Sequence, residues 1–468
     1  MLEVLHVQTE MYRLSHYDEE QLKELRNTLM PGYGEGRDIS SSLGVVPSLG
    51  WSVIQDFDIL ALLHRSEDPR LEAFISYLRL KYENMNLLPA EQHFIRYNMG
   101  LYTPSGPHIA IVNCNSLQVT PSEVQSGVGA GSEEALVELS KRLAQNGFRV
   151  TIFAEVDSSS GLTLGSANPR YYPRDGIRMM EDEDFDLCLA WRRTDWWRLK
   201  QYLRCPIIFC PHDWASDKEL DTDGLDGTSF LTSYQAEEYF KYTPALRSLP
   251  WSVVGNGYDP SHFSAPHPVR EQLLCCYYSA YHRGLEGVLD AWPLVKEKHP
   301  EARLEIYYGR ENWGLLTDES LKKITTKIEA LKGHGVIERG RIPHRELARE
   351  MLRASLFINA SKFKETYGIV HVKSLAAGVV LVGTDVVDRS LVPQEIELLD
   401  HTSPSLVSDL ARQVISRLNQ AIGGELEPLR ERCRKHVENF TWKHSCERLV
   451  QFIAKEWKVE REHEGKER

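Results

Sequence analysis

The chain has 468 residues, which is enough for roughly two to four domains. Hydrophobic residues make up 42% of it and charged residues 26%, as is typical of a soluble globular protein. The formal net charge of -12 argues against a general nucleic-acid binder, because contacts with many phosphates need a basic face.

The cysteines and the apolar runs bear on the cellular compartment of the protein and suggest no metal site or redox motif. The eight cysteines form no CxxC pair and no cluster with zinc spacing, so we expect buried free thiols in a reducing environment. No run of about 18 apolar residues occurs, and the N-terminus does not resemble a secretory signal. A cytoplasmic protein without a transmembrane segment is therefore expected, and peripheral membrane contact stays open.

Residues 1–105 differ in pattern from the rest of the chain. Segments within them, such as 69–85, place apolar residues at helical spacing and predict a mostly helical N-terminal extension. The turn-forming stretch YTPSGP at 102–107 then indicates a boundary.

From residue 106 to about 265 the sequence alternates between short apolar runs and amphipathic segments. Strands are expected at 108–114, 149–156, 185–191, 206–211 and 252–259, and a further strand and helix between 229 and 242. The segment 133–147 predicts a helix that ends at Gly147. The alternation implies a parallel sheet covered by helices on both faces.

A second set of similar size follows over residues 266–440. Strands are expected at 273–280, 302–309, 335–342, 355–361 and 379–385, and helices at 285–299, 318–333 and 344–354. A last helix at 441–457 opens a C-terminal segment, 441–468. Ligands of such sheets bind at the carboxyl ends of the strands, so two facing sheets place a ligand in the cleft between the domains.

The Gly-rich segment SGVGAGSEEA, residues 126–135, is the first candidate site. Its glycines, including Gly129 and Gly131, let backbone N–H groups approach an anion at a helix start. A dinucleotide site fits poorly, because that fingerprint needs its glycines directly after the strand and Ser132 fills the third glycine position. A turn with a helix cap is the structural alternative.

Two cationic or titratable residues follow strand ends. His212, in FCPHDWAS, would face the cleft and hydrogen-bond a phosphate or a sugar hydroxyl, or else be held by local contacts. Arg283, at a strand-to-helix junction, can chelate a diphosphate with its fork of donors, although most arginines simply lie on the surface.

The segment FKETYGIVHVKSLAAG, 363–378, predicts a turn that leads into a small-residue helix. The backbone N–H groups from Thr366 through Tyr367 and Gly368 to Ile369 would form a cradle for a phosphate or hydroxyl at the helix start. Glu365 accepts hydrogen bonds only, which suits sugar hydroxyls; its structural alternative is a helix-cap acid. The acidic runs 181–186 and 221–223 could suggest a metal site, but such runs are more often solvated loops, and no metal is expected.

Together, in order and spacing, these segments resemble the GT-B glycosyltransferases, in particular retaining family 4, the glycosyl transferases group 1. The similarity covers about residues 107–457. VVGNGYDPSHF resembles the family's NG-[IV]-D-x-x-x-F motif, and RGLEGVLDAWPLVKEKHPEARLEIYYG its KG-x-x-x-L stretch. INASKFKETYGIVHVKSLAAG resembles the donor loop, often written P-S-x-x-E-x-[FY]-G-[ILM]-x-x-x-E-A. The resemblance implies an α/β GT-B fold, with two Rossmann-like domains that face each other across a cleft.

The resemblance also implies roles for individual residues. Arg283, in the place of the usual Lys, would hold the donor diphosphate, and Glu365 would contact hydroxyls of the transferred sugar. His212 would lie near the reaction centre, and Arg341 where the family's backbone frames the base. The other residues expected to bind the donor are Gly129, Gly131, Ser279, Thr366, Tyr367, Gly368, Ile369 and Lys373.

Two positions depart from the family. Tyr278 or Ser279 stands where an Arg is usual, so one cation of the diphosphate grip is missing. Lys373 replaces the second Glu, which in the family holds the ribose hydroxyls. We expect Lys373 to contact the donor's phosphates rather than its ribose hydroxyls. The alternative is that Lys373 points to solvent.

The expected function is transfer of a sugar from a UDP-, GDP- or ADP-linked donor to a glycan or other hydroxyl acceptor. The resemblance implies retention of anomeric configuration, with protein cations rather than a metal or another cofactor at the leaving diphosphate. Two rival functions explain the order of the motifs less well. One is a non-catalytic nucleotide-sugar or carbohydrate binder on the same fold, and the other is an NAD-type oxidoreductase.

Overall fold

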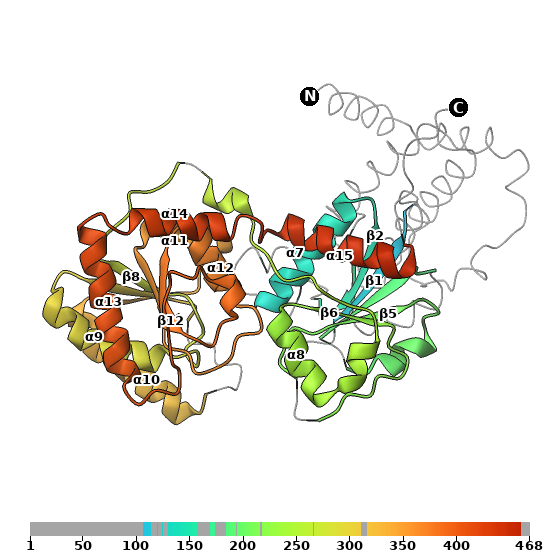
Figure 1. Cartoon of the computed structure of the whole chain (residues 1–468), viewed down its shortest axis with the longest axis horizontal. Coiled ribbons are helices and arrows are strands. Elements are labelled where there is room, and N and C mark those ends of the chain that lie inside the picture. The colour runs from blue at the N-terminus through green and yellow to red at the C-terminus, as the bar shows by residue number, and fades with distance from the viewer. Residues whose placement is uncertain are drawn as a thin grey trace, which may run out of the picture.

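The computed structural model describes residues 106–113, 119, 124, 130–156, 169–173, 184–192, 194–215, 218–264, 266–309 and 316–459. The expected helical extension, 1–105, lies outside the described residues. Two parallel sheets stand side by side in the described part of the chain, each flanked by helices (Figure 1).

The first sheet has the strand order β3-β2-β1-β4-β5-β6-β7. Its strands are β1 His108–Asn113, β2 Arg149–Ala154, β3 Arg170–Pro173, β4 Leu187–Trp191, β5 Ile207–Cys210, β6 Gly227–Phe230 and β7 Trp251–Val253. The central β1 pairs in parallel with β2 and β4, through Ile109 opposite Val150 and Leu187. All six residues of β1 are buried, which explains its near-continuous apolar sequence.

The second sheet has the order β10-β9-β8-β11-β12-β13. Its strands are β8 Leu274–Tyr277, β9 Arg303–Tyr307, β10 Val336–Gly340, β11 Leu356–Asn359, β12 Val380–Thr384 and β13 Leu398–Leu399. All of its paired strands are parallel as well. The two sheets and their helices confirm the predicted GT-B arrangement of two Rossmann-like domains. The short strands β3 and β13 were not predicted.

Helices cover both faces of each sheet. In the first domain these are α7 Gly131–Gln145 and α8 Ser233–Tyr242. The second domain has α9 Leu285–Lys298, α10 Asp318–Leu331, α11 His344–Arg353, α12 Ile369–Ala376, α13 Leu406–Ile422 and α14 Glu427–His436. Short 3₁₀ turns are η3 Trp196–Gln201, η4 Pro244–Ser248, η5 Pro260–Phe263, η6 Lys332–His334 and η7 Arg389–Leu391.

The last helix, α15 Trp442–Trp457, returns to the first domain. It follows α14 along one side of the molecule and lies beside α7 (Figure 1). Trp442, Cys446, Leu449 and Ile453 of α15 pack into the same apolar core as strands β1 and β2. Thr441 caps its start by accepting a hydrogen bond from the backbone N–H of His444.

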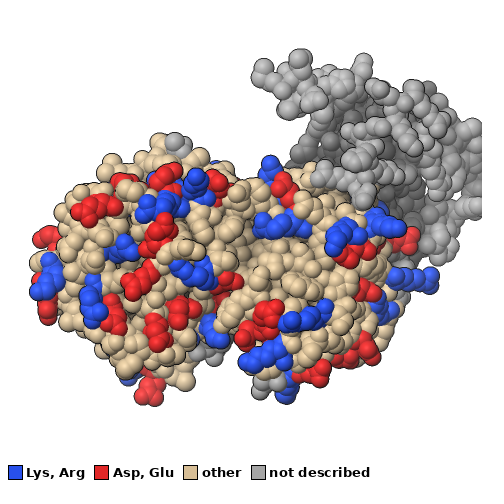
Figure 2. Space-filling model, in the orientation of Figure 1, with Lys and Arg blue, Asp and Glu red and all other residues tan. Residues whose placement is uncertain are grey.

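The surface carries mixed charge. Acidic and basic side chains are interspersed over the face of both domains that Figure 2 shows, and the surface is indented between the domains at the lower edge of that view. Among the helices that the structure describes, none combines the length and the apolar character needed to span a membrane.

Candidate functional site

Both sheets reverse their strand order beside the central strand. The reversal lies between β1 and β4 in the first sheet and between β8 and β11 in the second. In open α/β sheets the loops diverge at such a point and leave a crevice at the carboxyl ends of the strands. The candidate site is therefore built from residues at the carboxyl edges of the two sheets, around these four strands.

The second domain brings two predicted residues together. Nη1 of Arg283, after β8, lies 2.6 Å from Oε1 of Glu365, after β11. The two side chains are only 24% and 13% exposed. The guanidinium of Arg283 also lies over the ring of Phe363, 3.9 Å from its centroid. A planar cation is thus held between a carboxylate and an aromatic face, a geometry that an ammonium would not share.

Two glycines allow these loops to approach each other. Gly284 has φ +94, and a Cβ there would lie 2.3 Å from the carbonyl carbon of Ala360. Gly368, the residue before α12, has φ +75, and a Cβ there would lie 2.6 Å from Nδ1 of His371. Both positions combine a left-handed backbone with a close contact, which only glycine accepts without strain.

A buried polar cluster joins the segments that follow β8 and β11 to helix α12. Nδ2 of Asn359 lies 3.3 Å from Nε2 of His371 and 3.5 Å from Oγ of Ser279. Oδ1 of Asn359 accepts a hydrogen bond from the backbone N–H of Ser361. Burial lowers the pKa of His371, so its ring is neutral in this cluster. The sequence reasoning placed Ser279 here but missed Asn359 and His371.

The donor loop is longer than the motif it resembles. Three residues, 362–364, separate Ser361 from Glu365, whereas the motif has two. Ser361 closes a turn over them: its Oγ accepts from the backbone N–H of Phe363 and lies 3.1 Å from the carbonyl of the same residue. This turn presents the exposed Phe363 ring to Arg283. The extra residue was a readable signal that the motif comparison passed over.

Several donor-loop residues contact the first domain. Thr366 Oγ1 donates to the carbonyl of His212 at 3.3 Å, and Tyr367 donates its hydroxyl to the carbonyl of Asn256 at 2.6 Å. The Tyr367 side chain is buried, which raises its pKa. Ile369 packs against the cores of both domains, and a Cβ at Gly131, the first residue of α7, would lie 3.2 Å from its Cδ1. The predicted cradle is therefore also an interdomain contact.

His212 lies at the carboxyl edge of the first sheet. Its ring stacks on Trp191 with the centroids 4.2 Å apart. The indole Nε1 of Trp191 donates to Oγ of Ser132 at the start of α7. Burial, and then the nearby Arg192 cation, lowers the pKa of His212 to about 3, so the imidazole is neutral. Trp191 was missed because its role depends on two loops distant in sequence.

The guanidinium of Arg192 contacts two carboxylates at the same edge of the sheet. It has φ +58, an uncommon conformation for a residue other than glycine. Its guanidinium donates to both oxygens of Asp213, at 2.8 and 3.0 Å, and lies 3.4 Å from Oε1 of Glu133. The arrangement holds the loop that carries His212 against the first turn of α7. The sequence reasoning did not single out Arg192.

Lys373 does not point to solvent. Its Nζ lies 2.7 Å from both carboxylate oxygens of Glu134, in the first turn of α7. Lys373 and Glu134 are buried. The alternative of a solvated lysine is therefore wrong, because the side chain crosses to the other domain and ends on a carboxylate. Its expected contact with a donor stays a prediction.

Arg341 and Gly129 complete the predicted set. Arg341, after β10, lies over the ring of Tyr308, 4.4 Å from its centroid, at the carboxyl ends of β9 and β10. Tyr308 has φ +129. Gly129 lies outside the described residues.

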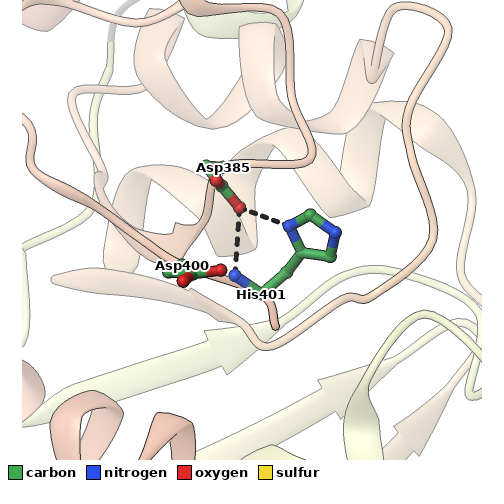
Figure 3. A group of neighbouring side chains, drawn as sticks. All are labelled: Asp385, Asp400 and His401. Atoms are coloured by element: carbon green, nitrogen blue, oxygen red, sulfur yellow. Dashed lines mark hydrogen bonds and ion pairs between the residues drawn. The ribbon is translucent and has the colours of Figure 1, made fainter. Parts of the chain in front are cut away.

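One group of potential metal ligands occurs among the described residues: Asp385, Asp400 and His401 (Figure 3). Oδ1 of Asp385 lies 2.6 Å from Nδ1 of His401 and accepts from the backbone N–H of His401 as well. Oδ1 of Asp400 accepts from the backbone N–H of Thr402. These bonds close a surface turn and account for the cluster by themselves. The acidic residues 181–183 lie outside the described residues, and Asp221 accepts from the backbone N–H of Asp223 in a turn.

Comparison with protein families gives a match over residues 272–420, to the family described as Glycosyl transferases group 1. The match spans β8 through most of α13 and includes Arg283, Glu365 and Lys373. Residues 272–420 are thus similar to the glycosyl transferases group 1 family. The predicted class of enzyme, a glycosyltransferase, is thereby confirmed.

Solved structures show the same fold over both domains. Sucrose-phosphate synthase from Thermosynechococcus elongatus is 16% identical, with a TM-score of 0.56, over 76% of this chain and 100% of that one. HepE from Anabaena, in complex with UDP and glucose, is 13% identical, with a TM-score of 0.58, over 75% and 100%. A glycosyltransferase from Rickettsia africae is 13% identical, with a TM-score of 0.57, over 75% and 99%. No curated protein matches the sequence.

Proposed function

We propose that the protein transfers a sugar from a nucleoside-diphosphate sugar to a hydroxyl acceptor, with retention of anomeric configuration. The observation that carries the proposal is the Arg283–Glu365 pair at the strand-order reversal of a domain that is similar to the glycosyl transferases group 1 family. A structural neighbour, HepE, was solved with UDP and glucose and with UDP-glucose, which supports a donor of this class.

Arg283 suits the diphosphate of such a donor, and Glu365 suits its sugar. The leaving diphosphate gains negative charge as the glycosidic bond breaks, and the Arg283 guanidinium stabilises that charge. The backbone N–H groups at the start of α12 also stabilise the charge of the diphosphate, because a helix N-terminus favours an anion. Glu365 accepts hydrogen bonds from hydroxyls of the sugar.

The first domain supplies the opposite wall. The neutral imidazole of His212 can exchange one hydrogen bond with a sugar hydroxyl without repelling or attracting the diphosphate strongly. The acceptor hydroxyl attacks on the face that the diphosphate leaves, and an oxygen of the diphosphate takes its proton. No protein general base is required by this path. Because Arg283 and the helix N-terminus carry the charge, we expect turnover to persist in the presence of a metal chelator.

The acceptor is a hydroxyl of a glycan or of a lipid- or protein-linked sugar in this proposal. A thermal-shift screen of UDP-, GDP- and ADP-sugars tests the donor. A ligand that binds only the native state at 100 times its Kd stabilises it by about 2.7 kcal/mol, so one nucleotide class should raise the Tm clearly. If none of the three classes raises it, the proposal is contradicted.

A non-catalytic nucleotide-sugar binder is the second candidate. It is favoured by two ion pairs within the protein, Arg283 with Glu365 and Lys373 with Glu134, which occupy side chains expected to bind the donor. Binding without turnover of any donor, by hydrolysis or transfer, would favour this candidate.

A further inference from the structure

Lys373 and Glu134 form a buried ion pair between the two domains. Lys373 lies on α12 of the second domain, and Glu134 lies in the first turn of α7 of the first domain. The side chains are only 10% and 9% exposed, and Nζ lies 2.7 Å from the carboxylate oxygens. Nδ1 of His344, at the start of α11, lies 3.7 Å from the same carboxylate.

The carboxylate of Glu134 is ionised in this setting. Burial alone would raise the pKa of Glu134, but the adjacent Lys373 ammonium holds it below the usual range. His344 itself is neutral, because burial and Lys373 lower its pKa to about 4. Lys373 therefore supplies the charge that compensates Glu134.

Lys373 lies at the end of the segment 366–373, which contacts the first domain at several points. Thr366 Oγ1 donates to the carbonyl of His212, and Thr232 Oγ1 donates to the carbonyl of Thr366. Ile369 packs into both cores next to Gly131. These contacts are neutral and short-range, whereas the Lys373–Glu134 pair is the charged contact that anchors α12 to α7.

We propose that the Lys373–Glu134 ion pair is an interdomain clamp that positions the donor loop. Both are positioning residues: they hold residues 364–369, and with them Glu365, at a fixed place opposite His212 on the first domain. The effect on sugar transfer rests on the proposed function, whereas the clamp itself does not. The position where a ribose-binding acid is expected thus serves domain alignment in this chain.

The energetics of buried pairs give the clamp a distinctive mutational pattern. Removal of one partner leaves the other charge buried and uncompensated, whereas removal of both relieves that penalty. Lys373→Met and Glu134→Gln should each loosen the segment, and the double variant should be less damaging than either. Exchanging the charges, Lys373→Glu with Glu134→Lys, should recover part of the contact, and Lys373→Arg should recover most of it.

Hydrogen–deuterium exchange of the full chain without nucleotide is the test. In Lys373→Met, backbone amides of 364–372 should exchange about tenfold faster or more, because a buried charge is left unpaired and local opening becomes easier. The matched control is Lys327→Met, which removes a lysine that bridges Glu286 and Asp290 within the second domain. It should leave exchange of 364–372 unchanged.

Unchanged exchange of 364–372 in Lys373→Met overturns the proposal, as does a double variant that is worse than both single variants. If Lys373→Met does not fold, the charge-exchanged variant decides: protection of 364–372 near the wild-type level supports the clamp, and its loss overturns it. Donor hydrolysis is measured in parallel. A positioning role lowers kcat more than it raises KM, with recovery in Lys373→Arg. Absence of both hydrolysis and transfer in the wild type contradicts the proposed function and leaves the exchange result to decide the clamp.

Discussion

The carboxyl edges of the two sheets share a topology but differ in their charged contacts. In the second domain, Arg283 and Glu365, which follow β8 and β11, pair with one another. In the first domain, the cation Arg192 joins Asp213 to the buried Glu133. Its neighbour, His212, is neutral and stacked on Trp191.

The difference indicates a division of labour between the edges. The Arg283–Glu365 pair, in contact through one carboxylate oxygen, can exchange that contact for a diphosphate and a sugar, because both partners then keep a charged or polar counterpart. A bidentate Arg–Asp contact next to a buried carboxylate instead fixes loop geometry. We therefore expect mutations at the second edge to change both donor binding and turnover, and those at the first edge to change turnover with little effect on diphosphate affinity.

The largest effect should come from Arg283→Met. Loss of one preorganised charge-stabilising group costs about 10²- to 10³-fold in rate, so donor turnover should fall by that order. Hydrolysis of the donor identified by the thermal-shift screen measures it. Arg412→Met, on the exposed side of α13, is the control and should be neutral. A change below about threefold in Arg283→Met would show that the cation has no role in turnover.

Glu365→Gln should separate sugar recognition from diphosphate recognition. Turnover of the donor should fall about tenfold or more, since the acceptor for sugar hydroxyls is weakened. Affinity for the free nucleoside diphosphate should rise, because Arg283 no longer has a carboxylate partner. Calorimetric titration with the diphosphate and kinetics with the donor test both signs. A loss of both donor turnover and diphosphate affinity would contradict these separate roles of Arg283 and Glu365.

Trp191→Leu tests the first edge. It removes the stack on His212 and the hydrogen bond to Ser132, so kcat should fall about tenfold while diphosphate affinity changes little. Trp197→Leu, a tryptophan 46% exposed on η3, is the matched control. An equal loss of diphosphate affinity in Trp191→Leu would remove the distinction between the two edges.

The smallest effect concerns pH. The folded pKa of His212 is about 3, below the ordinary value of 6.5, so the unfolded chain binds the proton first as the pH falls. The contribution of His212 to stability is present above pH 6.5 and is lost progressively towards pH 3. For this half-buried ring we expect His212→Gln to reduce the loss in free energy of unfolding between pH 7 and 4.5 by about 1 kcal/mol. Urea unfolding at the two pH values measures it, and an unchanged difference would contradict a neutral His212.

The fold was largely predictable because its signals are local. Buried parallel strands such as β1 and β12 are short apolar runs, and the helices between them have amphipathic spacing. The strands that were missed lack this signal. β3 reads RYYP and β13 has two residues, so neither stands out from a loop.

The site was predictable only where a residue's role depends on its own loop. Arg283 and Glu365 were singled out because they follow strand ends, and the structure brings them together. Trp191 and Arg192 act through contacts with α7 and with the loop after β5, which no local pattern shows. Lys373 and Glu134 are separated by 239 positions in the sequence, and their pairing depends on how the two domains dock.

Donor hydrolysis by the wild type, Arg283→Ala and Glu365→Ala tests the central claim most directly. The account predicts slow hydrolysis of one nucleoside-diphosphate sugar by the wild type and its loss in both variants, with the folded state retained. Hydrolysis that persists in both variants would contradict the assigned site. Binding of the donor without any turnover, by hydrolysis or by transfer to an acceptor, would contradict the transferase itself.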